Sequence, residues 1–148
     1  MSDDLTPIPV SPEALRALAR WEGALSDPTL SAGHWEGGDR LPDGSIQMPW
    51  FDRSAVIDRF GREMAACGMV RSVGWMDWAG TERGRSLMVD PAAVASASPD
   101  ELVCIVTATI RGERFADGTI EAAVEHGVLL AAARRAAALL GDRPADGR

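Results

Sequence analysis

The densest group of reactive side chains lies in residues 111–119, which read Arg-Gly-Glu-Arg-Phe-Ala-Asp-Gly-Thr. Guanidinium groups such as those of Arg111 and Arg114 bind carboxylates and phosphates through paired hydrogen bonds. Glu113 or Asp117 could act as a general acid or base beside such an anion. The segment is therefore the first candidate site in the chain, with an anionic ligand or substrate as the chemistry it suits.

A junction between two helices requires many of the same residue types. Cations are favoured at the end of one helix and anions at the start of the next, because of the helix dipole. Asp117 can cap the second helix with its carboxylate, and Gly118 lets the chain turn. Phe115 is expected to point into the core. A structural corner with internal ion pairs is the main alternative to a site.

Acidic residues recur at four-residue spacing after the corner, at Asp117, Glu121 and Glu125. Three carboxylates near one helix face could hold a hard divalent cation. However, His126 directly follows Glu125, so the Glu-x-x-His spacing of dimetal helix bundles is absent. His34 is isolated in a predicted loop. The sequence therefore predicts a solvated acidic face, with no metal site and no cofactor.

The tryptophans supply a second candidate feature. Four of the five fall in segments predicted to be loops: Trp35, Trp50, Trp75 and Trp78. Such residues line ligand clefts and protein interfaces, although they also cover the cores of small domains. If they converge near Arg114, they form a pocket for a small molecule or a peptide. The candidate binding residues are Trp35, Asp77, Trp78, Arg111, Glu113, Arg114, Asp117 and Glu125.

Helices are the main elements expected to position these residues. Ser11-Pro12-Glu13 and Ser98-Pro99-Asp100-Glu101 are helix starts with a serine cap and a proline in the first turn. The β-branched run 103–110 would also suit a strand, but the cap favours a helix. Apolar spacing and the terminal glycines predict about five helices. They cover about 12–25, 53–67, 91–95, a segment from 99 to the corner, and 119–140.

Residues 26–50 are rich in glycine and proline and lack helical periodicity. The Pro42-Asp43-Gly44 turn lies between two short segments, 34–35 and 45–48. This arrangement predicts either a small β-hairpin within 34–50 or an irregular loop over the core. Residues 75–78 are expected to be a loop as well.

The chain length, the composition and the predicted helices indicate one mainly α, compact, bundle-like domain over 11–141, with flexible tails at 1–10 and 142–148. The chain has 148 residues, 46% hydrophobic and 25% charged, which are ordinary globular values. The net charge of −7 disfavours nucleic acid and anionic lipid as partners. The start is acidic and no apolar run reaches the length of a membrane span, so we expect a cytoplasmic protein. The alanine-rich last helix permits close helix packing within the domain or across a homodimer.

All fifteen basic residues are arginine, and asparagine and tyrosine are absent as well. The codons of the missing residues are rich in A and T, so this bias indicates a bacterial genome of high GC content. Cys67 and Cys104 lie among apolar residues, which is typical of small buried hydrophobes in a reducing compartment. Neither observation points to a particular chemistry.

Four short motifs follow one another along the chain: Gly33-x-Trp35-x-Gly37-Gly38, Met48-Pro49-Trp50, Asp77-Trp78 and the 111–119 segment. In this order they resemble an uncharacterised family of small bacterial proteins, a domain of unknown function, over roughly 33–140. The resemblance implies a cytosolic bacterial domain and a shared role for the 111–119 corner. It implies no activity and no catalytic residue.

The sequence favours a binding or interaction module with a tryptophan-lined cleft beside Arg114 and an unidentified small molecule or protein as partner. It contains no Gly-x-Ser-x-Gly, Cys-x-x-Cys or phosphate-binding glycine motif. The alternative is a small hydrolase or transferase for an anionic substrate, in which an arginine holds the anion and Glu113 or Asp117 is the acid/base.

Overall fold

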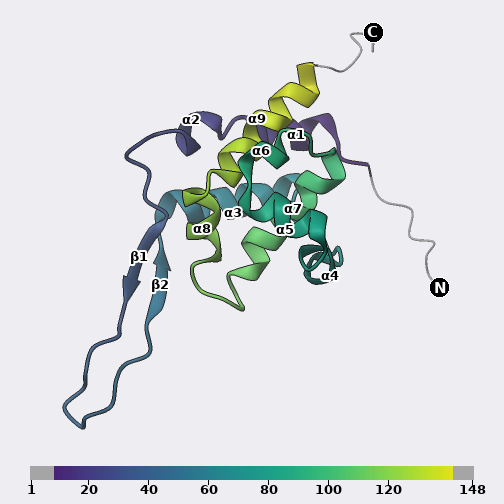
Figure 1. Cartoon of the computed structure of the whole chain (residues 1–148). Helices are drawn as coiled ribbons and strands as arrows, with labels where there is room; N and C mark the ends of the chain where they lie inside the picture. The colour runs from purple at the N-terminus through teal and green to yellow at the C-terminus, as the bar shows by residue number, and fades with distance from the viewer. Residues whose placement is uncertain (1–8, 142–148) are drawn as a thin grey trace.

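The computed structural model describes residues 9–141 and is mainly helical, with one small antiparallel hairpin (Figure 1). The mainly helical class and the small hairpin are confirmed, although the helices outnumber the five expected. They are α1 (Pro12–Ala19), α2 (Glu22–Leu25), α3 (Ala55–Cys67), α4 (Trp75–Ala79), α5 (Glu82–Val89), α6 (Pro91–Val94), α7 (Pro99–Gly112), α8 (Thr119–Glu125) and α9 (Val128–Gly141). The strands are β1 (Gly33–Glu36) and β2 (Trp50–Arg53). Apart from residues 9 and 10, the predicted tails lie outside the described residues.

The helix starts with serine caps form as predicted. The Ser11 hydroxyl accepts a hydrogen bond from the backbone N–H of Ala14 at 3.0 Å. At the start of α7, the Glu101 N–H donates to the Ser98 hydroxyl, and the Ser98 N–H donates to the Glu101 carboxylate. This reciprocal pair satisfies two N–H groups that a helix start leaves open. It explains why residues 99–112 are a helix despite their β-branched composition.

The predicted last helix is wrong in one respect, because it is two helices. Gly127 has a φ of +80°, which ends α8 and lets α9 leave in a new direction. The predicted loop at 75–78 is also wrong, since these residues form α4. In addition, α5 was not anticipated. It starts at a Thr81 cap, and a Cβ on its Gly84 would overlap the Trp78 carbonyl oxygen. Glycine therefore allows α5 to pack closely against α4.

The main core lies between α7, α9, α1 and α3. Its fully buried side chains include Leu15, Phe60, Ile105 and Leu129. On α9 the small residues Ala132, Ala133 and Ala136 are all completely buried. The close helix packing that the alanines permit is therefore used within the chain, where α1 lies against α9. Within residues 9–141, no helix is long and apolar enough to span a bilayer.

The hairpin predicted within 34–50 is present, but its second strand lies further along the chain. β1 pairs with β2 in antiparallel register, His34 opposite Asp52. The predicted turn at residues 42–44 forms the tip, and the arm projects from the helical body (Figure 1). A second, smaller core cluster anchors the base of the arm, where Phe51 packs with Ala32, Ile57 and Ile120. This cluster joins the arm to α3 and to the start of α8.

Candidate functional site

The corner between α7 and α8 is held by the Glu113 carboxylate. This side chain is 4% exposed, and its two oxygens accept hydrogen bonds from different backbone N–H groups. Oε2 accepts from Gly118 at 3.0 Å and Oε1 accepts from Ile120 at 2.9 Å. A carboxylate in this position accepts hydrogen bonds from backbone N–H groups that have no partner within α8. Its negative charge also interacts favourably with the positive end of the helix dipole. Glu113, at the end of one helix, therefore caps the next.

Asp117 does not have the capping role that the sequence suggested. Its Oδ2 accepts a hydrogen bond from the backbone N–H of Phe51, at 3.0 Å. The N-cap of α8 is Gly118, whose φ is +98° and which provides no side-chain cap. Because Glu113 already occupies the first turn, Asp117 is free to attach the corner to β2. The corner and the arm thus form one connected unit.

Phe115 is 70% exposed, so the expectation that it points into the core is wrong. The inner side of the corner is taken by Glu113 and by Ile120, which belongs to the smaller core cluster. The Phe115 ring lies outside, with its centroid 6.1 Å from the Trp75 ring at a tilt of 46°. The exposed ring needs an explanation other than folding, because its burial would have been favourable.

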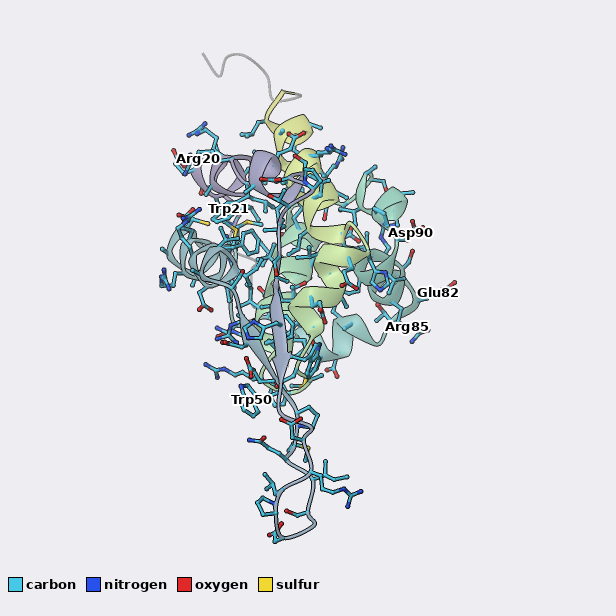
Figure 2. The ribbon with its side chains drawn as sticks, turned by 90° about the vertical axis from the view of Figure 1, so that its left-hand side faces the viewer. Arg20, Trp21, Trp50, Glu82, Arg85 and Asp90 are labelled. Carbon is cyan, nitrogen blue, oxygen red and sulfur yellow. The ribbon has the colours of Figure 1, made fainter. Side chains whose placement is uncertain are left out.

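An apolar groove of about 560 Å³ begins at this aromatic pair. We call it the aromatic groove. It is built by α4, α5, α7 and the corner, and its lining residues are Trp75, Ala79, Arg85, Met88, Val89, Ala108, Gly112, Phe115, Ala116 and Thr119. The one charged lining residue is Arg85, an exposed side chain (Figure 2) whose guanidinium donates to the Gly80 carbonyl. The groove can therefore accept an apolar body with an anionic end.

A second groove of about 560 Å³ lies on the Arg114 side of the corner, between α3 and α7. Arg53, Arg62 and Arg114 line it, over an aliphatic floor that includes Ile57. Arg53 is paired with Asp58 at 2.9 Å, and this hydrogen bond raises the pKa of the Arg53 guanidinium above its usual range. Neither Arg62 nor Arg114 has an acidic partner within residues 9–141. The groove is polar, and Glu113 and Asp58 offset part of its positive charge.

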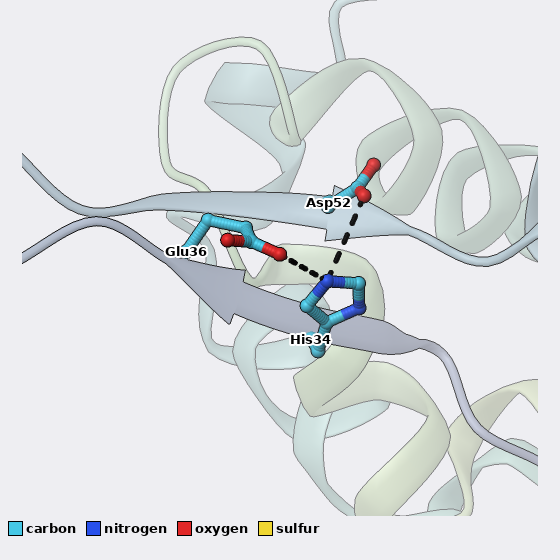
Figure 3. A group of neighbouring side chains, drawn as sticks. All are labelled: His34, Glu36 and Asp52. Carbon is cyan, nitrogen blue, oxygen red and sulfur yellow. Dashed lines mark hydrogen bonds and ion pairs between the residues drawn. The ribbon is translucent and has the colours of Figure 1, made fainter.

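A third group of side chains lies on the arm and was missed in the sequence. His34, Glu36 and Asp52 meet on one exposed face of the hairpin (Figure 3). His34 Nε2 lies 2.5 Å from Glu36 Oε2 and 3.7 Å from Asp52 Oδ2. The two-residue spacing of His34 and Glu36 was a usable signal for one strand face. Asp52 required the observed register, because the predicted second strand was 45–48.

Comparison with protein families shows to which family the chain belongs. The model of a family of unknown function, DUF6508, matches residues 10–142. The chain belongs to the DUF6508 family. This confirms the expected membership of a family of unknown function, and the match covers 10–142 where the expectation was roughly 33–140. No curated protein and no solved structure matches significantly. Membership of DUF6508 supplies no activity.

The aromatic residues proposed from the sequence are separated in this DUF6508 member. Trp78 is half-buried against the main core, and Asp77 is exposed beside it on α4. Trp35 lies on β1, where its Nε1 donates to Glu121 at 3.1 Å and its ring packs edge-on against Phe51. None of the three predicted residues lines either groove. The tryptophan that does is Trp75.

The charged candidates are also distributed over different surroundings in the DUF6508 fold. Arg114 is exposed and lines the arginine side of the corner, while Arg111 is half-buried at the end of α7. Glu125 is exposed on α8. Glu113 and Asp117 both accept backbone hydrogen bonds, which accounts for their conformations without a ligand. The corner therefore has an exposed aromatic ring beside a groove, whereas its two acids are occupied by backbone hydrogen bonds and do not form an acid/base pair.

Proposed function

We propose that this DUF6508 member is a binding module for a small molecule that has an apolar ring system and an anionic group. The observation that carries the proposal is the Phe115 ring, 70% exposed, which faces Trp75 over the aromatic groove. Large exposed rings next to an apolar concavity are typical of ligand sites. The volume of about 560 Å³ is within the range of small-molecule sites, roughly 300–1,000 Å³.

The anionic group of the ligand would bind to Arg85. This guanidinium has a carbonyl partner in Gly80 but no acidic partner within residues 9–141. An arginine without a carboxylate partner retains donors for a carboxylate, sulfonate or phosphate. Its place in the lining of an otherwise apolar groove favours an amphiphilic anion over a purely apolar ligand.

The hydrolase or transferase alternative receives less support from the geometry. It needs Glu113 or Asp117 to exchange a proton with a substrate. Both oxygens of Glu113 accept backbone hydrogen bonds in a buried position, and Asp117 holds β2. A role in capping and attachment explains both acids. We therefore propose no second function.

The proposal is tested with 8-anilinonaphthalene-1-sulfonate, a probe with aromatic rings and one anionic group. The full chain is expected to bind it with enhanced probe fluorescence, and Phe115→Ala should weaken binding about tenfold. Loss of one aromatic contact and its buried area corresponds to roughly 1.5 kcal/mol. Trp50→Ala is the matched control, because Trp50 is an exposed aromatic on the arm, outside the aromatic groove (Figure 2).

The role of Arg85 is tested with the neutral analogue N-phenyl-1-naphthylamine. Arg85→Gln should weaken binding of the sulfonate by about fivefold and leave the neutral probe unchanged, because only the sulfonate uses the guanidinium. Equal affinity of wild type and Phe115→Ala for both probes would refute the aromatic groove as the site. Equal loss in Trp50→Ala would show binding at the arm instead.

A further inference from the structure

We propose that His34, Glu36 and Asp52 form a binding site for one divalent transition-metal ion of the zinc type. The site is on the arm, away from the aromatic groove, and the proposal does not depend on the proposed function. It departs from the sequence, which predicted no metal site. Each of the three side chains offers one ligand atom, and these atoms all lie within 4.8 Å of one another, with both carboxylates turned toward the imidazole (Figure 3).

The distances between the ligand atoms suit a metal ion after small side-chain movements. Zinc binds imidazole nitrogen at about 2.0–2.1 Å and carboxylate oxygen at about 2.0–2.2 Å. Two ligands at the tetrahedral angle are then roughly 3.4 Å apart. His34 Nε2 is 2.5 Å from Glu36 Oε2 and 3.7 Å from Asp52 Oδ2. The first pair would have to widen by about 0.9 Å and the second to close by about 0.3 Å, and rotamer changes of these exposed side chains can provide both movements.

The backbone of the hairpin holds the three ligands on one face. Residues two apart in a strand share a face, which places His34 with Glu36. The register places Asp52 directly opposite His34 on the neighbouring strand. On the other face of the ladder, Trp35 packs against the buried Phe51. Because that face is attached to the helical body, the ligand face always points into solvent.

The charges at this position also favour a cation. Glu36 and Asp52 carry two negative charges, and within the described range of 9–141 the His34 imidazole is the one basic side chain in contact with them. Arg53, the neighbouring residue on β2, is paired with Asp58 instead. A neutral imidazole with two carboxylates leaves a charge of −2 that a divalent ion balances. The protein as a whole has a net charge of −7, which attracts cations as well.

The imidazole is what distinguishes this group from an ordinary acidic patch. Nitrogen ligands favour zinc, nickel and copper, whereas magnesium and calcium prefer oxygen ligands only. Three protein ligands leave a fourth position for water, as in open zinc sites. The exposed fractions of 62% for the His34 side chain and 60% for Asp52 leave that position accessible. The group should therefore select zinc over magnesium.

The test is isothermal titration of the full chain with zinc chloride after treatment with a chelator and its removal. We expect one zinc ion per chain at the arm, a higher melting temperature with zinc, and no response to magnesium at the same concentration. His34→Ala should lower the zinc affinity at least tenfold. His126→Ala is the matched control, because His126 is the other histidine and is also exposed, at the C-terminal end of α8. It should bind zinc as the wild type does.

Cobalt(II) absorption gives a second readout, since a four-coordinate site with a nitrogen ligand absorbs more strongly than aqueous cobalt, and His34→Ala should abolish this increase. Glu36→Gln is a second variant with the same expectation, in case His34→Ala does not fold by circular dichroism. The proposal is overturned if zinc does not bind, if both variants bind it as well as wild type, or if magnesium binds equally. The last outcome would show a simple acidic patch, and the first would leave the three residues as an ion-paired cluster.

Discussion

Glu113 contributes to this protein through two hydrogen bonds that leave both of its carboxylate oxygens occupied. It is nearly fully buried, and the N–H groups of Gly118 and Ile120 are its partners. Side chains of this kind can be mistaken for catalytic acids, because buried carboxylates are also frequent in active sites. Here the partners are backbone groups of a helix start. The burial of Glu113 is therefore explained by its capping of α8.

Glu113→Ala should therefore lower the free energy of unfolding by about 2–4 kcal/mol, because two backbone donors lose a charged acceptor. Denaturant unfolding measured by circular dichroism is the check. Glu125→Ala, an exposed acid on α8, should stay within about 0.5 kcal/mol of wild type. Similar stabilities for the two variants would contradict the capping role of Glu113.

At the scale of elements, the arm is attached to the helical body by specific contacts. The Trp35 ring lies against Gly118, and its Nε1 donates to Glu121. Asp117, in the corner before α8, accepts from the Phe51 N–H of β2, so a second hydrogen bond attaches the arm. These contacts couple β1 and β2 to the start of α8. The corner is a junction of three elements, not only of two helices.

Gly118→Ala should be more destabilising than Gly38→Ala by at least about 1 kcal/mol. Both glycines have positive φ values, +98° and +82°, so both variants experience backbone strain of about 1 kcal/mol. Only at Gly118 would the added Cβ meet another group, the Trp35 ring at 2.9 Å, whereas Gly38 has open space. Displacement of that ring would break its bond to Glu121. Thermal unfolding of the two variants measures the difference, and equal losses would show that the ring moves freely.

At the scale of the whole molecule, the alanines of α9 let α1 pack closely against it. Ala133→Leu should lower the free energy of unfolding by about 1–3 kcal/mol, because the added carbons have no space in the core. Ala137→Leu, at an exposed position of the same helix, should change it by less than about 0.5 kcal/mol. Denaturant unfolding of both variants checks this. A larger effect at Ala137 would indicate that this face is covered, as a homodimer would require.

Stability should also depend on pH through the Arg83–Glu101 pair. The hydrogen bond from Arg83 lowers the pKa of Glu101, so the folded state holds the proton less tightly than the unfolded state does. The resulting stabilisation is present above the pKa of the unfolded chain and is lost as the pH falls through the lower folded value. Arg83→Gln should thus be less stable than the wild type at pH 7, and the two stabilities should become equal in acid.

Thermal unfolding measured from pH 7 to pH 2 tests this pair. Arg62→Gln is the control, because Arg62 has no acidic partner within residues 9–141. The melting temperature of Arg62→Gln should differ from that of the wild type by the same amount at every pH. The difference at pH 7 will be small, since both side chains of the Arg83–Glu101 pair are partly exposed and water screens the charges. A difference that persists below pH 3 would assign the effect of Arg83 to its other contacts, such as Ser96.

The sequence by itself determined the local features of this protein. The serine caps at Ser11 and Ser98, the turn at 42–44 and the mainly helical class follow from interactions between residues close in the chain. Local capping and turn chemistry need no tertiary context, so these predictions are confirmed. The single helix predicted over 119–140 is split at Gly127, and the loop predicted at 75–78 is the helix α4, so both predictions were wrong. There, composition favoured one state and packing of neighbouring elements selected another.

Only the tertiary structure decided which distant residues meet. Asp117 contacts Phe51, His34 meets Asp52, and Trp75 faces Phe115. Each pair depends on strand register or on the angle between helices, and one residue of shift would separate it. The 111–119 segment was correctly recognised as an unusual corner. Glu113 caps α8 through contacts inside the corner. The attachment by Asp117 depends on β2 and the position of Phe115 beside the groove depends on α4, and neither of these elements is adjacent to the corner in sequence.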